Sequence, residues 1–339
     1  MDAIVLVGGQ GVRLRPLTRT RHKSLIPMAN RPAIEYLFEW LRRSGFDRVV
    51  LALGQHNDDL ARAYPSGVHH GMAFLVIEES TRLESGGAIR NAVQTAGIEG
   101  RFAVLNGDIF IDFDFAAALA THEARGADLT LALHEVDDPS QYGVAVVNAE
   151  DMVTGFVEKP PPGTAPGNLI NAGVWIFEPH LVDQIPPGAV RVEETLFPSL
   201  VGRGRPVYGH RAPGEWADLG TSARYLAMNG VLMKAQGTSA LGKGVRLGTG
   251  ATVSESAVGD GTVLGDHSTV RSSILWERVN VASGVEINDS IIADGVTIGA
   301  NARLDRVVIG ARATIAAGVH ARPGTIVEPD AQYDGKDDE

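Results

Sequence analysis

Apolar or small residues recur at every sixth position from residue 245, and this period restricts the possible fold more than any other feature of the sequence. The first run consists of Val245, Ala251, Ala257, Val263, Thr269, Leu275, Val281 and Ile287. After a shift of one position it continues through Ile292, Ile298 and Leu304, and after another shift through Ile309, Ile315, Ala321 and Val327. Helices repeat every ~3.6 residues and strands every two, so neither element produces this spacing.

A six-residue repeat predicts a hexapeptide parallel β-helix, in which each short strand forms one side of a coil. We expect residues 240–330 to form such a domain. The alternative is an irregular glycine-rich sandwich, and the single register held from Val245 to Ile287 argues against it. Residues 331–339 are polar and acidic, and we expect them to form a frayed tail.

The first 236 residues alternate short apolar runs with helical patterns, and we expect them to form one α/β domain. The expected strands are Ile4–Val7, Val49–Leu53, Phe74–Ile77 and Phe102–Leu105, and the expected helices are Pro32–Gly45, Asp58–Tyr64 and Ala88–Ala96. This alternation predicts a mostly parallel sheet with helices on both faces. Ligands of such sheets bind beyond the carboxyl ends of the strands, so the loops after Val7 and Leu105 should share one crevice.

Composition excludes several classes of function. The chain has no cysteine, which excludes disulfides, thiolate metal sites and a cysteine nucleophile. Its formal net charge of -11 argues against broad nucleic-acid binding but allows one small anion pocket. The apolar run at the start is too short for a signal peptide, and no stretch is long enough to span a bilayer. We therefore expect a cytoplasmic protein with neither a nucleic-acid nor a membrane partner.

A glycine-rich loop directly follows the first expected strand. The loop runs Gly8-Gly9-Gln10-Gly11-Val12-Arg13, and glycines at such a turn let backbone N–H groups approach a phosphate. It fits neither common glycine motif, because Leu14 replaces the third glycine of the dinucleotide fingerprint and no Gly-Lys-Ser/Thr follows. A cationic run comes next, made of Arg13, Arg15, Arg19, Arg21, His22 and Lys23. We expect Arg15, Arg19 and Arg21 to be solvated, and Arg13 and Lys23 to suit a triphosphate.

The segment Gly8–Thr18, with Lys23, Leu25, Pro27, Asn30 and Pro32 after it, resembles the signature of the sugar-1-phosphate nucleotidyltransferases. The most similar subgroup is that of the mannose-1-phosphate guanylyltransferases. The resemblance implies transfer of a nucleoside monophosphate from an NTP, with GTP favoured, to a sugar 1-phosphate, with mannose 1-phosphate favoured. It also implies a Rossmann-like sheet followed by a left-handed parallel β-helix.

The resemblance assigns roles to individual residues of the loop. The nucleotide-binding residues would be Leu6, Gly8, Gly9, Gly11, Arg13 and Lys23, with Arg13 and Lys23 also acting in catalysis. Three residues depart from the usual pattern, namely Val12 in place of Thr, and His22 and Ser24 in place of the prolines that flank the lysine. These departures remove no charge, but a looser loop could move Lys23.

Two aspartates, far apart in the sequence, resemble the family's Mg²⁺ ligands. Asp108 ends a strand in Asn-Gly-Asp, and Asp218 lies in Trp-Ala-Asp-Leu-Gly-Thr. A divalent cation on carboxylate oxygens offsets the repulsion between two phosphates, so Mg²⁺ is the expected cofactor and Asp108 also a catalytic residue. Each aspartate alone could equally be a turn or cap residue. Asp112 and Asp114 are expected to cap the helix that begins near Phe115.

Further short motifs resemble those that line the substrate pockets of the family, although each could also simply form a turn. The resemblance places the sugar phosphate on Gly143, Glu158, Lys159, Asn171 and Gly173. It places the nucleobase on Glu84, Gly86 and Gly87, and Glu193 near the sugar. A carboxylate at position 84 could accept hydrogen bonds from guanine, uracil or thymine, so this segment leaves the base open.

Three alternatives stay open. The same reaction could use UTP or dTTP and another sugar or cyclitol phosphate. The chain could be a non-catalytic homologue that senses nucleotide sugars, although it keeps the loop and metal residues that such subunits usually lose. The β-helix could be an acyltransferase with His267 or His320 as its base, but we expect it instead to build a homo-oligomer.

Overall fold

The computed structural model describes residues 1–55 and 58–336, so the last three residues of the expected acidic tail lie outside the described residues. By contacts the chain forms two compact units. The first, here called the sheet unit, comprises Met1–Gly9 and Tyr36–Trp216, and the second, the coil unit, comprises Gln10–Glu35 and Ala217–Glu339. The boundary after Gly9 therefore divides the glycine-rich loop, and the whole cationic run lies in the coil unit.

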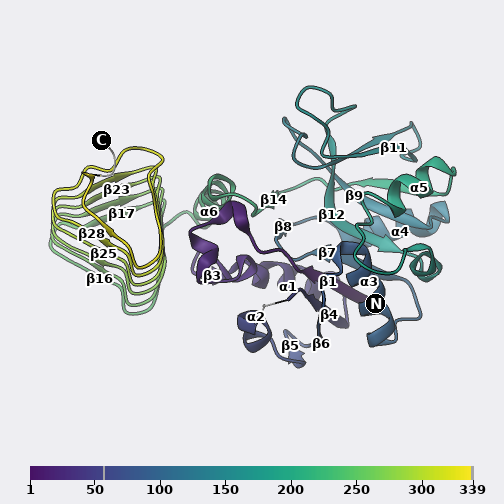
Figure 1. The fold of residues 1–339 in the computed structure, drawn as a ribbon, viewed down its shortest axis with the longest axis horizontal. Coiled ribbons are helices and arrows are strands. Elements are labelled where there is room, and N and C mark those ends of the chain that lie inside the picture. The colour runs from purple at the N-terminus through teal and green to yellow at the C-terminus, as the bar shows by residue number, and fades with distance from the viewer. Residues whose placement is uncertain (56–57, 337–339) are drawn as a thin grey trace. The chain divides into compact units, whose positions relative to one another are not determined.

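The sheet unit contains one large sheet and its helices (Figure 1). Its strands are β1 (Asp2–Val7), β4 (Arg48–Leu53), β5 (Gly67–His69), β6 (Met72–Glu78), β7 (Phe102–Asn106), β8 (Ile109–Ile111), β9 (Leu129–Glu135), β10 (Gly143–Val147), β11 (Val153–Glu158), β12 (Leu169–Phe177) and β13 (Val207–Arg211). Its helices are α1 (Ala33–Arg43), which begins within the coil unit, α2 (Asp58–Ala63), α3 (Glu84–Ala96), α4 (Phe115–Arg125), η4 (Pro179–Gln184) and α5 (Leu196–Gly202). Strand β14 (Trp216–Asp218) spans the unit boundary.

The sheet has the strand order β11-β10-β12-β7-β1-β4-β6-β5, with β9 paired to β12 and β13. Strands β7, β1, β4 and β6 run parallel, as the strand–helix alternation predicts. Strands β10, β11 and β12 are antiparallel to their neighbours, so the sheet is mixed. Parallel neighbours need a crossover such as a helix, whereas short loops join antiparallel strands.

Helices cover both faces of the sheet. Phe74 and Ile77 of β6 point to opposite faces, because side chains alternate along a strand. The ring of Phe74 contacts that of Phe38 in α1 at 4.9 Å. Ile77 belongs instead to a core cluster with Ile89 of α3 and Phe197 of α5. The predicted helices on both faces are thus confirmed.

The starts of two helices can be compared with the sequence predictions. Helix α3 begins at Glu84, four residues before the expected start at Ala88. Helix α4 begins after Asp114, whose carboxylate accepts a hydrogen bond from the Ala117 backbone N–H at 3.2 Å, as expected of a cap. Asp112 does not cap this helix, because its carboxylate pairs with Arg43 at 3.2 Å.

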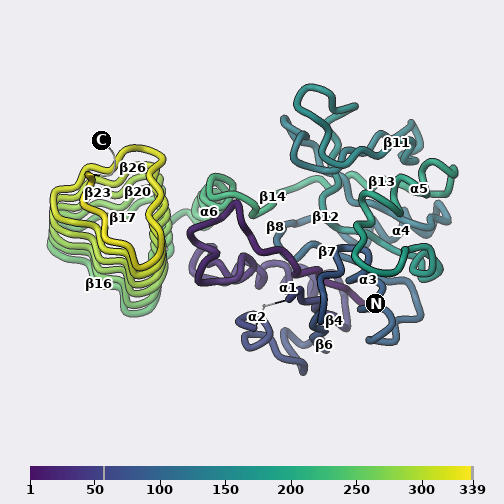
Figure 2. The backbone as a smooth tube through the Cα atoms, in the orientation of Figure 1, coloured from purple at the N-terminus to yellow at the C-terminus, as the bar shows by residue number. Residues whose placement is uncertain are grey.

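The coil unit begins with three short turns and a small hairpin. They are η1 (Val12–Leu14), η2 (Leu17–Arg19), η3 (Lys23–Leu25), β2 (Pro27–Met28) and β3 (Arg31–Pro32). After β14, helix α6 (Ser222–Gln236) leads into the strands β15 (Ala240–Leu241), β16 (Arg246–Leu247), β17 (Thr252–Ser254), β18 (Ala257–Val258), β19 (Val263–Leu264), β20 (Thr269–Arg271), β21 (Ile274–Leu275), β22 (Asn280–Val281), β23 (Glu286–Asn288), β24 (Ile291–Ile292), β25 (Thr297–Ile298), β26 (Arg303–Asp305), β27 (Val308–Ile309), β28 (Thr314–Ile315), β29 (Ile326–Val327) and β30 (Gln332–Tyr333). Three parallel sheets result, and Figure 2 shows them as the sides of stacked coils. The predicted parallel β-helix is confirmed.

The single six-residue register predicted for Val245–Ile287 holds at Leu275, Val281 and Ile287, which are buried, but not in the coil before them. Ala257 pairs with Ile274 and Ile274 with Ile291, so each of these coils has 17 residues, and one side of each coil is a residue short. In that coil the residues of the core cluster are Val258, Leu264 and Val270, each one residue after the position that the period predicted, although Ala257 is buried as well. Small or apolar residues stand at both positions, which conceals the slip in the sequence.

Buried serines join successive coils on the short side. The hydroxyl oxygen of Ser256 accepts from the Ser273 backbone N–H at 3.0 Å, and that of Ser273 accepts from the Ser290 N–H at 3.1 Å. The Ser290 hydroxyl accepts in turn from the Val307 N–H at 3.1 Å. These bonds satisfy buried polar groups that would otherwise destabilise the coil.

Candidate functional site

Several predicted site residues of the sheet unit lie at one edge of the sheet, where β1 and β7 end. Leu6 is in register with Asn106, and its carbonyl accepts from the Gly107 N–H at 2.9 Å. Val174 of β12 is in register with Leu105, which brings Asn171–Gly173 to the same edge. The exposed Gly8–Gly9 turn, the half-buried Asp108 and the Asn-Ala-Gly segment therefore share the carboxyl edge of the parallel strands.

The next residues of the loop belong to the coil unit and fold on themselves. Gly11 has a φ of +59°, and a Cβ there would lie 2.8 Å from the Thr18 methyl group and 3.2 Å from the Lys23 Cβ. The Thr18 hydroxyl donates to the Gly11 carbonyl at 2.7 Å. Glycine is thus required where the loop turns against Lys23.

His22 closes the turn that carries Lys23. Its ring Nδ1 accepts from the Ser24 backbone N–H at 3.2 Å, so His22 caps η3, and Ser24 is buried. The Leu25 N–H also donates to the His22 carbonyl, at 2.9 Å. The departure from flanking prolines therefore leaves an ordered turn rather than a loose loop.

Arg13 and Asp218 lie together beside Gly220, although 205 positions separate them in the sequence. A Cβ on Gly220 would stand 2.7 Å from Asp218 Oδ1 and 2.9 Å from Arg13 Nη2. The Asp218 carboxylate accepts from the Gly220 N–H at 2.7 Å and from Arg224 Nη1 at 2.8 Å. One aspartate of the predicted pair is thus next to the arginine of the glycine-rich loop.

Arg224 was not among the predicted site residues, but the sequence holds a signal for it. It lies in the first turn of α6, behind the Thr221 cap, where a cation opposes the helix dipole. A carboxylate partner offsets that cost, and Asp218 supplies it at 2.8 Å. Asp108 belongs to the sheet unit, and among residues 1–55 and 58–336 no three His, Asp or Glu side chains form a metal-binding group.

Three of the predicted sugar-phosphate residues, Gly143, Glu158 and Lys159, meet where β10 and β11 pair. Gly143 is in register with Glu158, and a Cβ on Gly143 would lie 2.7 Å from Glu158 Oε2. The exposed Lys159 ammonium donates to Glu158 Oε1 at 2.8 Å, and the Lys159 backbone N–H donates to the Tyr142 carbonyl at 3.0 Å. On β12, Asn171 Oδ1 accepts from the Gly173 N–H and from Trp175 Nε1, which fixes its amide.

The predicted base segment packs on residues 185–193 of the same unit. The Glu84 carboxylate pairs with Arg82 at 2.7 Å and with Arg191 at 3.2 Å. A Cβ on Gly87 would lie 2.4 Å from the Gly188 carbonyl, and the Gly86 N–H donates to the Val190 carbonyl. Close packing alone therefore accounts for glycine at 86 and 87.

Ser85 in the same segment binds Glu193, a pair that the sequence did not predict. Its hydroxyl donates to Glu193 Oε2 at 2.5 Å and accepts from the Val192 N–H at 3.1 Å. Burial raises the pKa of the Glu193 carboxyl above its usual range, and the nearby Glu158 raises it further, while the Ser85 bond opposes this shift. Ser85 of the predicted base segment is thus hydrogen-bonded to Glu193, which in turn interacts electrostatically with Glu158.

The cationic run divides into residues of different surroundings. Arg15 and Arg19 are exposed, as expected, and Arg19 pairs with the exposed Glu328 at 3.3 Å. Arg21 is not solvated, contrary to expectation, because it pairs with two carboxylates of the β-helix. His267 and His320 are both exposed.

Residues 2–234 match the protein family described as Nucleotidyl transferase. The chain belongs to this family. Residues 239–333 match a second family, described as GlmU-like, C-terminal hexapeptide. The nucleotidyltransferase domain is therefore followed by a left-handed β-helix of hexapeptide repeats, and the resemblance drawn from the glycine loop is confirmed.

The nucleotidyltransferase is similar to several curated proteins. The mannose-1-phosphate guanylyltransferase of Mycobacterium tuberculosis is 32% identical over 83% of this chain and 81% of its own length. The mannose-1-phosphate guanylyltransferase catalytic subunit beta of Dictyostelium discoideum is 35% identical over 69% of this chain and 65% of its own. The UTP–glucose-1-phosphate uridylyltransferase of Synechocystis sp. is 32% identical over 69% of this chain and 64% of its own. The chain thus spans slightly less than two thirds of the last two relatives.

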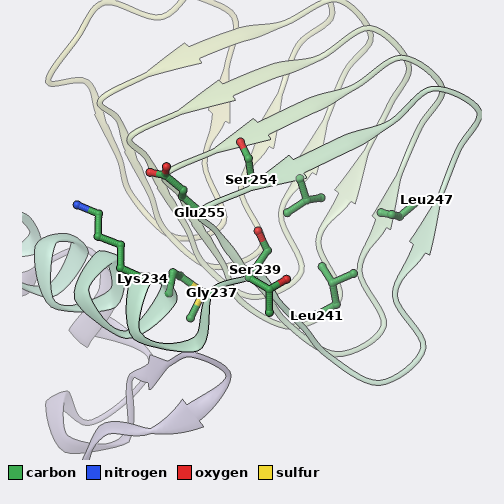
Figure 3. Close-up of a pocket in the computed structure, with 10 residues that line it drawn as sticks. Lys234, Gly237, Ser239, Leu241, Leu247, Ser254 and Glu255 are labelled. Carbon is green, nitrogen blue, oxygen red and sulfur yellow. The ribbon is translucent and has the colours of Figure 1, made fainter.

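A further feature of the nucleotidyltransferase involves none of the predicted site residues. A hollow of about 510 Å³ lies between the end of α6 and the first coils, lined by Lys234, Ser239, Leu241 and Glu255 among others (Figure 3). In the described part of the chain, no helix combines the length and the apolar character needed to cross a membrane.

Proposed function

We propose that the protein transfers GMP from GTP to mannose 1-phosphate in the cytoplasm, giving GDP-mannose and pyrophosphate. The family assignment supports nucleotidyl transfer, and the names of two of the relatives above support this base and sugar. The observation that carries the proposal is the position of the Arg13 guanidinium beside the Asp218 carboxylate at Gly220. The third relative, which uses UTP and glucose 1-phosphate by name, keeps UTP or dTTP with another sugar phosphate as the second candidate.

Mg²⁺ is the proposed cofactor, held by Asp108 and Asp218. Carboxylate oxygens are the ligands that this hard cation prefers. Asp218 fits the role. The Gly220 N–H and the Arg224 guanidinium fix its carboxylate, and each carboxylate oxygen keeps a further lone pair that can bind a metal. When bound, the metal would offset the negative charge of the reacting phosphates.

The proposed reaction is a single in-line displacement, in which a sugar phosphate oxygen attacks the α-phosphorus and pyrophosphate leaves. The protein contributes by positioning and by charge, which together can supply many kcal/mol. In this proposal Arg13 and Lys23 stabilise the triphosphate and the leaving group, and Lys159 holds the sugar phosphate. The remaining proposed contacts to the nucleotide are made by Leu6, Gly8, Gly9, Gly11, Glu84, Gly86 and Gly87. Those proposed to the sugar are made by Gly143, Glu158, Asn171 and Gly173.

Pyrophosphate release from a panel of NTPs crossed with sugar 1-phosphates tests this proposal. The expected result is the highest kcat/KM for GTP with mannose 1-phosphate. A higher kcat/KM for UTP or dTTP would change the nucleotide assigned to the protein but would leave the assigned reaction, nucleotidyl transfer, unchanged. Nucleotide-sugar binding without any turnover would instead support the non-catalytic sensing homologue.

The functions of the two domains are also proposed here. We assign catalysis to residues 1–236 and assembly of a homo-oligomer to the β-helix of residues 240–330. Helix α6 ends at Gln236 and β15 begins at Ala240, which supports a boundary there. Light scattering of the purified chain would give its mass in solution, and a monomer would refute the oligomer.

A further inference from the structure

The segment that carries Arg13 and Lys23 has little regular structure of its own. Between Gln10 and Glu35 it forms three short turns, the β2–β3 hairpin and the start of α1. Such a segment cannot hold two side chains against a triphosphate unless other elements fix it. Its compact unit also contains α6 and the β-helix, so their contacts determine where the segment lies.

Arg21 makes four of these contacts. Its guanidinium donates to both oxygens of Glu277, at 3.3 and 2.9 Å, and to Asp294 Oδ2 at 2.8 Å. The same group lies over the ring of Trp276 at 4.8 Å from the centroid. Glu277 and Asp294 are 17 residues apart, which is one coil, so a single side chain binds two successive coils.

The pairing is partly shielded from solvent. The side chains of Arg21, Glu277 and Asp294 are 23%, 30% and 15% exposed. A planar guanidinium is well suited to bind two carboxylates and to stack on an indole at once, which a lysine ammonium cannot do. By comparison, Arg19 and Glu328 form a pair whose side chains are 46% and 55% exposed, and such pairs contribute little.

A buried hydrogen-bond chain extends the contact to the turn of Lys23. Trp276 Nε1 donates to the Tyr225 hydroxyl at 3.1 Å, and this hydroxyl donates to the Pro27 carbonyl. Pro27 follows the η3 turn by two residues, and Tyr225 follows Arg224, the partner of Asp218. The β-helix is thus connected both to the lysine turn and to the Asp218 cluster.

We propose that Arg21 is a positioning residue for the nucleotide: by binding two coils of the β-helix, it fixes the segment that presents Arg13 and Lys23 to the triphosphate. The β-helix then takes part in nucleotidyl transfer as the support of the phosphate loop. This inference rests on the proposed function, because it assumes that these two cations bind the NTP.

Replacement of Arg21 by alanine tests the proposal in the full-length protein. Misplacing a substrate-binding group by about 1 Å can cost on the order of a hundredfold in rate, so we expect KM for the NTP to rise about tenfold and kcat to fall. KM for the sugar 1-phosphate should stay within about twofold, because none of the residues proposed to bind it belongs to the segment that Arg21 fixes. Arg21→Lys, which keeps the charge but not the fork, should give an intermediate KM.

Arg19→Ala is the matched control. It removes the same charge from the same segment and breaks a bond to the same β-helix, but at an exposed pair. We expect its KM for the NTP to match wild type. Equal effects of Arg19→Ala and Arg21→Ala on this KM would overturn the proposal, because charge alone would then explain them.

Folding and function are separated by two further measurements. If Arg21→Ala unfolds, Glu277→Gln keeps the shape of the partner and should still raise KM for the NTP severalfold. A folded variant with wild-type KM for the NTP, or with equal increases for both substrates, overturns the proposal. Absence of turnover by the wild type would refute the proposed function but not the role of Arg21. Titration calorimetry of GTP with wild type and Arg21→Ala would then decide that role, because it measures nucleotide affinity without turnover.

Discussion

Replacement of Gly220 by alanine is expected to slow nucleotidyl transfer without unfolding the protein. Gly220 lies between Asp218 and α6, and its backbone is not left-handed, so alanine is compatible with its conformation. The new Cβ, however, would stand 2.7 Å from Asp218 Oδ1 and 2.9 Å from Arg13 Nη2. Real Cβ atoms essentially never show contacts under 3.0 Å, so the carboxylate or the guanidinium must move.

The expected loss of activity follows from the hydrogen bonds that the Asp218 carboxylate would lose if it moved. Its oxygens are held by the Gly220 N–H at 2.7 Å and by Arg224 at 2.8 Å. A hydrogen bond to a charged group contributes about 1.5–3 kcal/mol. Since each ~1.4 kcal/mol of barrier is a tenfold change in rate, weakening one such bond predicts a loss of roughly ten- to a hundredfold in kcat/KM.

Gly230 in α6 supplies the control, because a Cβ there would meet no heavy atom within 4 Å. Gly230→Ala should keep kcat/KM and raise the free energy of unfolding by about 0.5–1 kcal/mol, as expected when a helix-interior glycine is removed. Pyrophosphate release gives kcat/KM, and denaturant unfolding gives the stability of both variants. Wild-type kcat/KM in a folded Gly220→Ala protein would refute the role of the Arg13–Asp218 pair.

Three further predictions concern other parts of the chain. Asp108→Asn, or removal of divalent metal with EDTA, should abolish pyrophosphate release while thermal unfolding stays near wild type; turnover by either sample would contradict the metal assignment. Lys159→Ala should raise KM for the sugar 1-phosphate by about tenfold and leave KM for the NTP within about twofold, and the reverse pattern would reassign the lysine. Burial, followed by Glu277, raises the pKa of Asp294 to about 7 despite Arg21. The folded protein therefore holds a proton on Asp294 that the unfolded chain releases near its usual pKa of 3.8. The free energy of unfolding should therefore fall as pH rises from about 4 to 7. Denaturant titrations of Asp294→Asn should lack this fall, and the same pH slope in the variant as in wild type would count against the raised pKa of Asp294.

Local patterns in the sequence predicted much of the fold. The strands β1, β4 and β7 and the helix α1 follow from apolar spacing within a few residues, and Asp114 caps α4 because the cap acts over three residues. The six-residue period likewise predicted the β-helix. The register shifts after Ile287 and Leu304 mark the shortened side of the later coils, but neighbouring small residues disguise the same shortening in the first coils.

Pairings between distant segments could not be predicted in this way. The antiparallel contacts of β12 with β7 and β9 join residues far apart in the sequence, and the motifs in residues 142–173 carry no signal for this pairing. In the same way, Ser85 and Glu193 are 108 positions apart, and neither residue type alone suggests the pair. Sequence resemblance proposed which residues serve the site, and the structure adds what holds several of them in place.

The cationic run shows why a count of charges is a poor guide to a phosphate site. Six cationic or titratable side chains fall between residues 13 and 23 of an acidic chain, and the sequence alone makes them look alike. In the structure the guanidinium of Arg21 is bound by two acidic side chains, 256 and 273 positions away, while Arg13 lies beside Asp218. Arg21 thus uses its charge to secure the segment to the β-helix, so its removal should weaken nucleotide binding through Arg13 and Lys23 rather than through a lost phosphate contact.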